Sequence, residues 1–517
     1  MNTFESIHQE AIEGSLSMFD RMLFKGHIQK MYFPNNITWF LYRQGVKLVD
    51  FKGYVIESSE KIKRHALGIA QQAGRRFEYL KGVVSHHSTG MSKEEYARQI
   101  AAEEGIQEGL VCVFSTVEQC QTFGVRKNAE GMIEAYSRSG QCLHYYFYYL
   151  DVEFGLMHIR LQSWLPYTIQ VYINGREWLG RQLNQREIQY ERYENSFTHI
   201  EDLKTAQELC EKFGHNEWAP LLKAFAKRVN PLLEVIQAAN FGEYYWVTDQ
   251  CEYATDIMFR DRAHLEKIMP DLYEQALLQG SPEDVMRFLG RKAHGRFEGE
   301  VVTDLKKRPQ GWRIKYRIKR NTLKLYDKAS VLRVETTINN PRDFKVSEAT
   351  PDQKRRWKTM GKGVSNLWRY REVSQQANAR FLEGLAQAKL KSEAVQHLDD
   401  LCRSHTKDGK RIARFNPLSQ ADLSLFQAIS GGEFAINGFR NHDVCSRMFP
   451  SPAASPMQTS QRRAKVSRLI AKLRGHGLVA KVKDSRLYRV TKLGARVLFA
   501  ILSFHHKEFP LAFFALS

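Results

Sequence analysis

Two carboxylates stand one residue apart, directly after a run rich in tyrosine and phenylalanine. Asp151 and Glu153 follow Leu143–Leu150, and a Phe-Gly pair comes next. In an extended chain, residues i and i+2 point to the same side, so both carboxylates could bind one divalent metal ion such as Mg²⁺ or Mn²⁺. The following glycine is equally typical of a turn, in which Asp and Glu are common. The pattern therefore predicts either a metal site or a polar turn.

Further carboxylates could complete a metal site with this pair, although the sequence alone does not bring them together. They are Glu252, Asp256, Glu298, Glu300 and Asp304. The chain has no P-loop, no GxSxG or HExxH motif and no dinucleotide fingerprint, so no nucleotide or organic cofactor is indicated.

A strongly cationic segment extends from Leu305 to Lys328, with ten Lys or Arg residues and one acid, Asp327. Apolar and polar residues alternate here and again up to residue 338, which predicts three antiparallel strands in a meander with an exposed cationic face. Tyr326 shares a face with Lys324 and Lys328. This combination suits single-stranded nucleic acid, because aromatic rings stack on bases while cations follow the phosphates.

Residues 323–338, LKLYDKASVLRVETTI, resemble the Tyr-Asp-Lys and Leu-Arg-x-Glu segment of phage and plasmid replication initiation proteins. Those proteins nick DNA with a tyrosine and a divalent metal held by carboxylates. The resemblance implies that Tyr326 is a nucleophile or substrate contact and that Lys328 and Arg333 hold phosphate. It also implies that Glu335 is a metal ligand or an orienting carboxylate. Such a metal would offset the charge that develops on the phosphate.

The chain departs from this class of nickases in its histidines. The class has two histidines that flank one apolar residue, whereas His86-His87 and His505-His506 are adjacent pairs. Adjacent residues of a strand face opposite sides, so neither pair is a ready ligand set. A hairpin in which Arg333 and Glu335 form a salt bridge explains the same residues without catalysis, and both interpretations stay open.

The C-terminal end begins with three prolines among small residues, which predicts a linker over residues 449–460. An apolar stripe then predicts a helix from Gln461 to Gly475. Residues 478–482 and 486–490 predict a hairpin, and residues 495–502 predict a last helix. This is the order of a winged-helix module, and HGLVAKVKDSRLYRVTKLG resembles the wing of bacterial winged-helix regulators.

The same C-terminal stretch has the charge expected of a DNA-binding module. From Gln461 to Arg496 there are twelve Lys or Arg residues and one acid, Asp484. A basic helix can enter the major groove while the wing contacts phosphates. The alternative is a solvated basic face used for protein contacts. The residues expected to bind nucleic acid here are Arg462, Lys465, Arg468, Lys472, Lys483, Arg486 and Arg489.

Composition supports a polyanionic partner, with DNA favoured over RNA. The 517 residues carry a formal net charge of +20. Seven cysteines without a CxxC pair indicate reduced thiols in a cytoplasmic protein rather than a disulfide framework or a zinc knuckle. The N-terminus lacks the pattern of a signal peptide, and the longest apolar run is too short to span a bilayer, so no membrane partner is expected.

These patterns predict an α+β, multidomain fold whose mixed or antiparallel-sheet body carries helical insertions and is followed by a winged-helix domain. Taken as a whole, the chain also resembles long bacterial proteins that bring no secure activity with them. The expected parts are an N-terminal α/β domain (1–130), a sheet core (131–360) with a helical insertion (about 200–295), a helical region (361–448), the linker (449–460) and the winged helix (461–517).

The predicted function is nucleic-acid binding, with DNA processing of the replication-initiation or mobile-element type. The first alternative is a non-enzymatic winged-helix regulator or architectural DNA-binding protein. The second is an RNA-binding or RNA-cleaving protein. The sequence predicts neither the target nor the oligomeric state.

Overall fold

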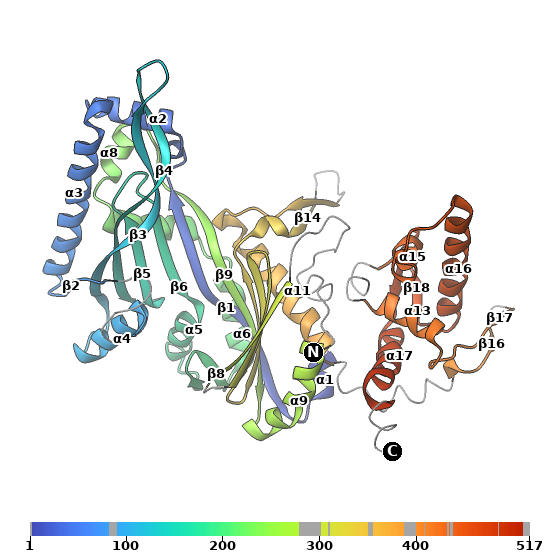
Figure 1. The fold of residues 1–517 in the computed structure, drawn as a ribbon. Coiled ribbons are helices and arrows are strands. Elements are labelled where there is room, and N and C mark those ends of the chain that lie inside the picture. The colour runs from blue at the N-terminus through green and yellow to red at the C-terminus, as the bar shows by residue number, and fades with distance from the viewer. Residues whose placement is uncertain are drawn as a thin grey trace. The chain divides into compact units, whose positions relative to one another are not determined.

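The fold is that of a computed structural model, which describes most of the chain (Figure 1). The described residues are 3–81, 90–278, 301–308, 311–349, 355–386, 400–407, 409–431, 434, 438–483 and 485–509. The residues His86, His87, Glu298, Glu300 and Asp484 lie outside these ranges, and so does Ser281, where Ser-Pro-Glu predicts the start of a helix. Among the described residues, no helix is both long enough and apolar enough to cross a membrane.

Helices and one large mixed sheet make up the fold, which confirms the predicted mixture of α and β structure. The hydrogen-bonded strand order is β10-β11-β12-β13-β9-β1-β6-β5-β4-β3-β2. Strand β2 pairs parallel to β3, whereas β3–β4, β4–β5, β5–β6, β1–β6, β10–β11 and β11–β12 are antiparallel. The strands are β1 (Ile12–His27), β2 (Arg76–Tyr79), β3 (Gly109–Lys127), β4 (Ile133–Asp151), β5 (Gly155–Gln162), β6 (Ile169–Asn174), β9 (Tyr245–Phe259), β10 (Val301–Arg308), β11 (Gly311–Ile318), β12 (Asn321–Lys328) and β13 (Val331–Ile338).

The chain divides into two compact units, each of which combines segments that are distant in the sequence. One unit comprises residues 14–256 and 335–375, and the other comprises 1–13, 257–334 and 376–517. In the first unit, α3 and α4 contact β3, and α7 contacts β5 and β6. Its helices are η1 (Gln29–Tyr32), α2 (Pro34–Arg43), η2 (Leu48–Asp50), α3 (Phe51–Gln72), α4 (Lys93–Glu103), α5 (Gly175–Asn184), α6 (Leu203–Phe213), α7 (Trp218–Val229), α8 (Leu233–Ala238), η3 (Pro341–Asp343) and η4 (Val364–Asn366), and its short hairpins are β7 (Tyr190–Tyr193) with β8 (Ser196–Ile200) and β14 (Lys345–Ala349) with β15 (Arg355–Thr359).

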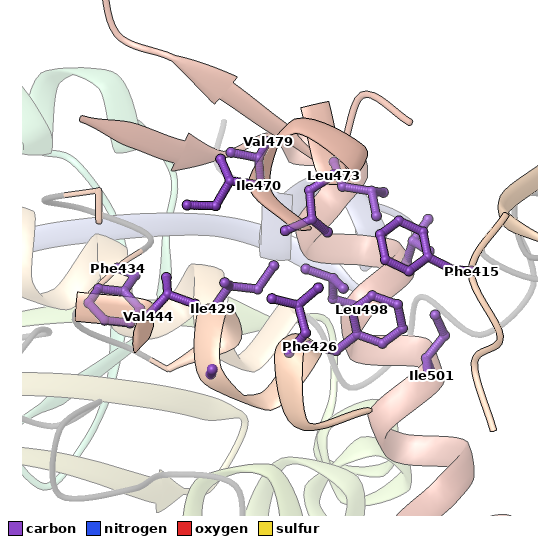
Figure 2. Packing of buried hydrophobic residues seen from close by; sticks show 14 of the residues in the cluster. Phe415, Phe426, Ile429, Phe434, Val444, Ile470, Leu473, Val479, Leu498 and Ile501 are labelled. Carbon is purple, nitrogen blue, oxygen red and sulfur yellow. The ribbon is translucent and has the colours of Figure 1, made fainter. Parts of the chain in front are cut away.

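The remaining elements include those of the C-terminal region. They are α1 (Thr3–Ile7), α9 (Arg262–Leu278), α11 (Leu367–Ala386), β16 (His405–Lys407), β17 (Lys410–Ile412), α13 (Gln420–Ser430), α15 (Asn441–Met448), α16 (Pro456–Gly475), β18 (Val479–Lys481), β19 (Tyr488–Val490), α17 (Lys492–Ser503) and the π-helical turn η6 (Phe504–Glu508). Figure 2 shows that α13, α16 and α17 share one apolar core, to which Phe426, Ile470 and Leu498 contribute.

Most predicted elements are present with close bounds. The helix α9 lies within the predicted helical insertion, and the three strands of the basic meander match β11, β12 and β13. The expected linker is shorter than predicted, because α16 begins at Pro456. The hydroxyl of Ser455 accepts a hydrogen bond from the backbone N–H of Gln458 at 3.2 Å and so caps this helix.

Two segments whose residues are typical of turns, residues 32–36 and Asn174-Gly175, are helix starts instead. Pro34 is the first residue of α2, where its fixed φ and missing N–H cost nothing. Asn174 caps α5, because its side chain accepts hydrogen bonds from the backbone N–H groups of Arg176 and Glu177. In both segments the turn-forming residues stand at a helix N-terminus rather than between strands.

Candidate functional site

Three buried carboxylates come together from three neighbouring strands. Asp20 lies on β1, Glu252 on β9 and Glu335 on β13, and one ligand oxygen of each lies within 4.8 Å of the other two. Their exposed fractions are 1%, 9% and 3%. Carboxylate oxygens are the ligands preferred by Mg²⁺ and related cations, so this acidic centre could hold a divalent metal.

Arg176 neutralises part of the charge at the acidic centre. Its side chain is fully buried; Nη1 donates to Oδ2 of Asp256 at 2.7 Å, and Nε lies 3.0 Å from Oδ2 of Asp20. Burial lowers the pKa of Arg176, but the carboxylates of Asp256 and Asp20 outweigh this effect and raise it above its usual value. The guanidinium therefore stays charged inside the protein.

The first turn of α5 explains how Arg176 reaches this position. A Cβ at Gly175 would lie 2.4 Å from the backbone oxygen of Phe19, so only glycine lets α5 begin directly against β1. Arg176, the next residue, then lies beside Asp20, which follows Phe19 in β1. The Asn174 cap fixes the same turn, because its Oδ1 accepts from the N–H of Arg176 at 2.9 Å.

The sequence implicated Glu335 and considered Glu252 and Asp256, but it missed Asp20 and Arg176. Two carboxylates of the acidic centre accept hydrogen bonds from side chains on the same strand. Gln250 donates to Oε1 of Glu252 at 3.2 Å, and Thr337 donates to Oε1 of Glu335 at 3.4 Å. Asp20 belongs to no motif, and its partners lie far along the chain, so only the strand order reveals it.

Asp151 and Glu153 form a polar turn, the alternative to the predicted metal site. Oδ1 of Asp151 accepts from the N–H groups of Glu153 and Phe154 at 2.9 and 3.1 Å. Oε1 of Glu153 accepts from the indole N–H of Trp178 at 3.3 Å. In the described part of the chain, the acidic group that includes Glu335 contains neither residue. A third candidate carboxylate, Asp304, pairs with Arg313 on the adjacent strand.

The predicted exposed cationic face of the meander is wrong for Lys324 and Arg333. These side chains are 8% and 1% exposed, and all eight residues of β13 are buried. Alternation along a strand shows which residues share a face, but not whether another element covers that face. Tyr326 and Lys328 are half-buried, and Nζ of Lys328 lies 5.5 Å from the ring centroid of Tyr326.

Asp327, between Tyr326 and Lys328, binds residues of α9. Its carboxylate accepts a hydrogen bond from the hydroxyl of Tyr273 at 3.0 Å and forms an ion pair with Arg262. The aspartate of the Tyr-Asp-Lys segment is therefore a packing contact between β12 and α9 rather than an open ligand.

The predicted nucleic-acid contacts of the C-terminal region differ in accessibility. The exposed ones are Lys465, Arg468, Lys483, Arg486 and Arg489, and Arg463 of the same helix as Arg468 is exposed as well. Arg462 and Lys472 are half-buried.

Arg462 and Lys472 are engaged within the protein. Arg462 donates to the backbone oxygen of Ser451 at 2.7 Å. Nζ of Lys472 lies 3.7 Å from the ring centroid of Phe415 and 3.6 Å from Oδ1 of Asp422. Lys472 is therefore held against the core of the C-terminal region.

No protein-family model, curated protein or solved structure matches the chain. Function is therefore inferred from the residues and geometry described above.

Proposed function

We propose that this protein binds duplex DNA through its C-terminal region, and that α13, α15, α16, the β18–β19 hairpin and α17 form a winged-helix module. Three helices, a hairpin and a last helix follow one another in the order of that fold. Phe439, between α13 and α15, exchanges two backbone hydrogen bonds of 2.8 Å with Tyr488 of β19, so a third extended segment joins the hairpin.

The observation that best supports the proposal is that α16 is amphipathic, with one apolar face and one basic face. Val466, Ile470 and Leu473 are buried in the shared core, whereas Lys465 and Arg468 are exposed. An α-helix fits the major groove, where exposed cations can contact base edges and phosphates. The exposed cations of the hairpin and its connection, Lys483, Arg486 and Arg489, suit phosphate contacts beside it.

The test uses the full chain and a labelled 20-base-pair duplex at salt concentrations from 50 to 200 mM. Replacing Arg463 and Arg468 with Ala should weaken binding and lower the dependence of log K on log salt by about one unit for each phosphate contact removed. Arg126→Ala is the matched control, because Arg126 is an exposed arginine on β3. Unchanged duplex binding in the double variant would contradict the proposal. Tighter binding to RNA would favour the RNA-binding alternative.

A second candidate function is metal-dependent processing of the bound nucleic acid at the acidic centre of Asp20, Glu252 and Glu335. Beyond the carboxylates, Nη2 of Arg176 is buried and makes no hydrogen bond within the described residues, so it can donate to a bound anion or water. A divalent metal would supply charge neutralisation at a phosphate group. The carboxylates would hold that metal, and Arg176 would orient Asp20.

Incubation of labelled single- and double-stranded DNA and RNA with the protein, with and without Mg²⁺ or Mn²⁺, tests this second function. Wild type, Glu335→Gln and Tyr326→Phe should be compared for cleavage and for a covalent adduct. If Glu335→Gln loses cleavage and Tyr326→Phe keeps it, the acidic centre is required for the reaction and Tyr326 is not its nucleophile. A wild type that binds DNA but never cleaves it would instead favour the regulator or architectural role.

A further inference from the structure

Four aromatic side chains are exposed within one short segment of the first unit. Tyr32, Phe33, Trp39 and Tyr42 have exposed fractions of 40%, 62%, 47% and 78%. Trp39 and Tyr42 are three residues apart on α2, so they share one side of that helix. Exposed large aromatic residues gathered in this way are typical of a binding surface.

Ring contacts join this segment to the start of β9. The ring of His27 lies 5.1 Å from that of Tyr32 and 5.4 Å from that of Tyr245, which is 46% exposed. The ring of Trp39 lies 6.2 Å from that of Phe241. The aromatic patch, which we define as Tyr32, Phe33, Trp39, Tyr42 and Tyr245, therefore spans η1, α2 and β9. In Figure 1, α2 lies near α8, whose C-terminal end leads to Phe241.

Cations accompany the aromatic patch. The guanidinium carbon of Arg43 lies 4.1 Å from the ring centroid of Trp39, and Lys30 is exposed beside Asn240, whose backbone oxygen accepts from its Nζ at 2.7 Å. Residues 25–52 contain five Lys or Arg residues and one acid, Asp50. The nearby carboxylate of Glu243 is paired with Lys223 at 2.5 Å.

We propose that the aromatic patch binds single-stranded nucleic acid, with bases stacked on Trp39 and Tyr42 and phosphates held by Arg43 and Lys30. Every base offers a face for stacking, so this mode of binding tolerates any sequence, and the local positive charge matches the backbone. The proposal goes beyond duplex binding, because it assigns a second surface with a different ligand to the body of the protein. With single strands bound at this surface and duplex DNA bound at the C-terminal region, one chain would bind both forms of nucleic acid.

The test measures binding of the full chain to fluorescein-labelled (dT)₂₀ and to a 20-base-pair duplex. Tyr42→Ala and the double variant Trp39→Ala/Tyr42→Ala should lower affinity for (dT)₂₀ by about tenfold or more, and Arg43→Gln should lower it as well. Duplex affinity should stay unchanged. Tyr79→Ala/Tyr193→Ala is the matched control, because those two rings are 55% and 42% exposed elsewhere. Tyr42→Ala keeps the test valid if loss of the Trp39–Phe241 contact impairs folding.

Several outcomes would overturn the proposal. Wild-type affinity for (dT)₂₀ in Tyr42→Ala and Arg43→Gln would do so, as would an equal loss in the control variant. Loss of (dT)₂₀ binding in Arg463→Ala/Arg468→Ala alone would assign single strands to the C-terminal region. Binding to phosphatidylserine vesicles that depends on Trp39 and Tyr42, without binding to (dT)₂₀, would make the patch a membrane-binding surface. If duplex binding fails in the wild type while (dT)₂₀ binding depends on Tyr42, the proposed duplex function fails and this one stands.

Discussion

Nη1 of Arg176 lies 2.7 Å from Oδ2 of Asp256, and both side chains are fully buried. Removing one partner of a buried ion pair leaves the other charge uncompensated, so Arg176→Met should lower the free energy of unfolding by about 3–5 kcal/mol. Urea denaturation followed by circular dichroism measures this change. Arg126→Met is the control: the pair of Arg126 with Glu134 is 62% and 39% exposed, and its loss should cost less than about 1 kcal/mol. Equal costs in the two variants would contradict the role given to Arg176.

The sequence predicted the elements of the sheet better than the site they build. Alternation of apolar and polar residues is a local pattern, so it was enough to predict the strands of the basic meander. The acidic centre depends on which strands are neighbours, and β13, β9 and β1 are neighbours only through pairings between distant segments. Glu335 could be predicted because its segment resembles one of the replication initiation proteins, whereas Asp20 belongs to no recognisable motif.

Burial was the second property that the sequence could not provide. Lys324, Arg333 and Lys472 all stand on faces that looked polar, yet the first two are buried and Lys472 is half-buried. In each case a charged residue has a long side chain whose apolar part can pack while its charge finds a partner, as Lys472 does with Phe415 and Asp422.

Metal binding at the acidic centre should appear as a change in thermal stability. If Asp20, Glu252 and Glu335 hold a divalent cation, 1 mM Mn²⁺ should raise the melting temperature of the wild type by several degrees, since a ligand that binds only the folded state stabilises it. Glu252→Gln/Glu335→Gln should shift much less. Glu134→Gln, which changes an exposed carboxylate on β4, should behave like the wild type. A Mn²⁺-induced shift that is equal in all three proteins would place the bound metal elsewhere.

Lys472 and Arg468 should have opposite phenotypes, although both belong to α16. The ammonium of Lys472 lies over Phe415 and near Asp422, so Lys472→Ala should destabilise the C-terminal region by about 1–2 kcal/mol while duplex affinity changes little. Arg468 is exposed, so Arg468→Ala should weaken duplex binding and leave the melting temperature nearly unchanged. Calorimetry and fluorescence anisotropy on the two single variants measure both effects. A loss of DNA affinity in Lys472→Ala as large as in Arg468→Ala would contradict the structural role of Lys472.

A histidine packed against aromatic rings in the first unit should make the protein sensitive to mild acid. The ring of His158 stacks on Tyr172 at a centroid distance of 5.0 Å and an angle of 12°, and the ring of Tyr148 lies 5.0 Å away. Burial, together with the charges of Lys93 and Arg160, lowers the pKa of His158 to about 3, and the opposing charge of Glu118 does not offset these effects. The imidazole is therefore neutral in the folded protein at pH values where an unfolded chain would protonate it.

The direction of the pH effect follows from proton binding. Below the ordinary histidine pKa of about 6.5, the unfolded state binds a proton at this position and the folded state does not, so stability falls as the pH decreases from about 6.5 towards 3. The pKa of Glu118 is lowered to about 2, because Arg160, Tyr146 and Lys93 outweigh the effect of its burial, so its own stabilising effect is lost only below about pH 4.5. Melting temperatures between pH 6.5 and 5 therefore exclude Glu118 but include His27 and His476, whose pKa values are also lowered by burial, so the variant at His158 is compared with the wild type. His158→Phe keeps the aromatic stacking and should make the decline in this range shallower, whereas His215→Phe, at an exposed position, should leave it as in the wild type. An unchanged slope in His158→Phe would mean that His158 is protonated in the folded protein or that other groups dominate the acid response.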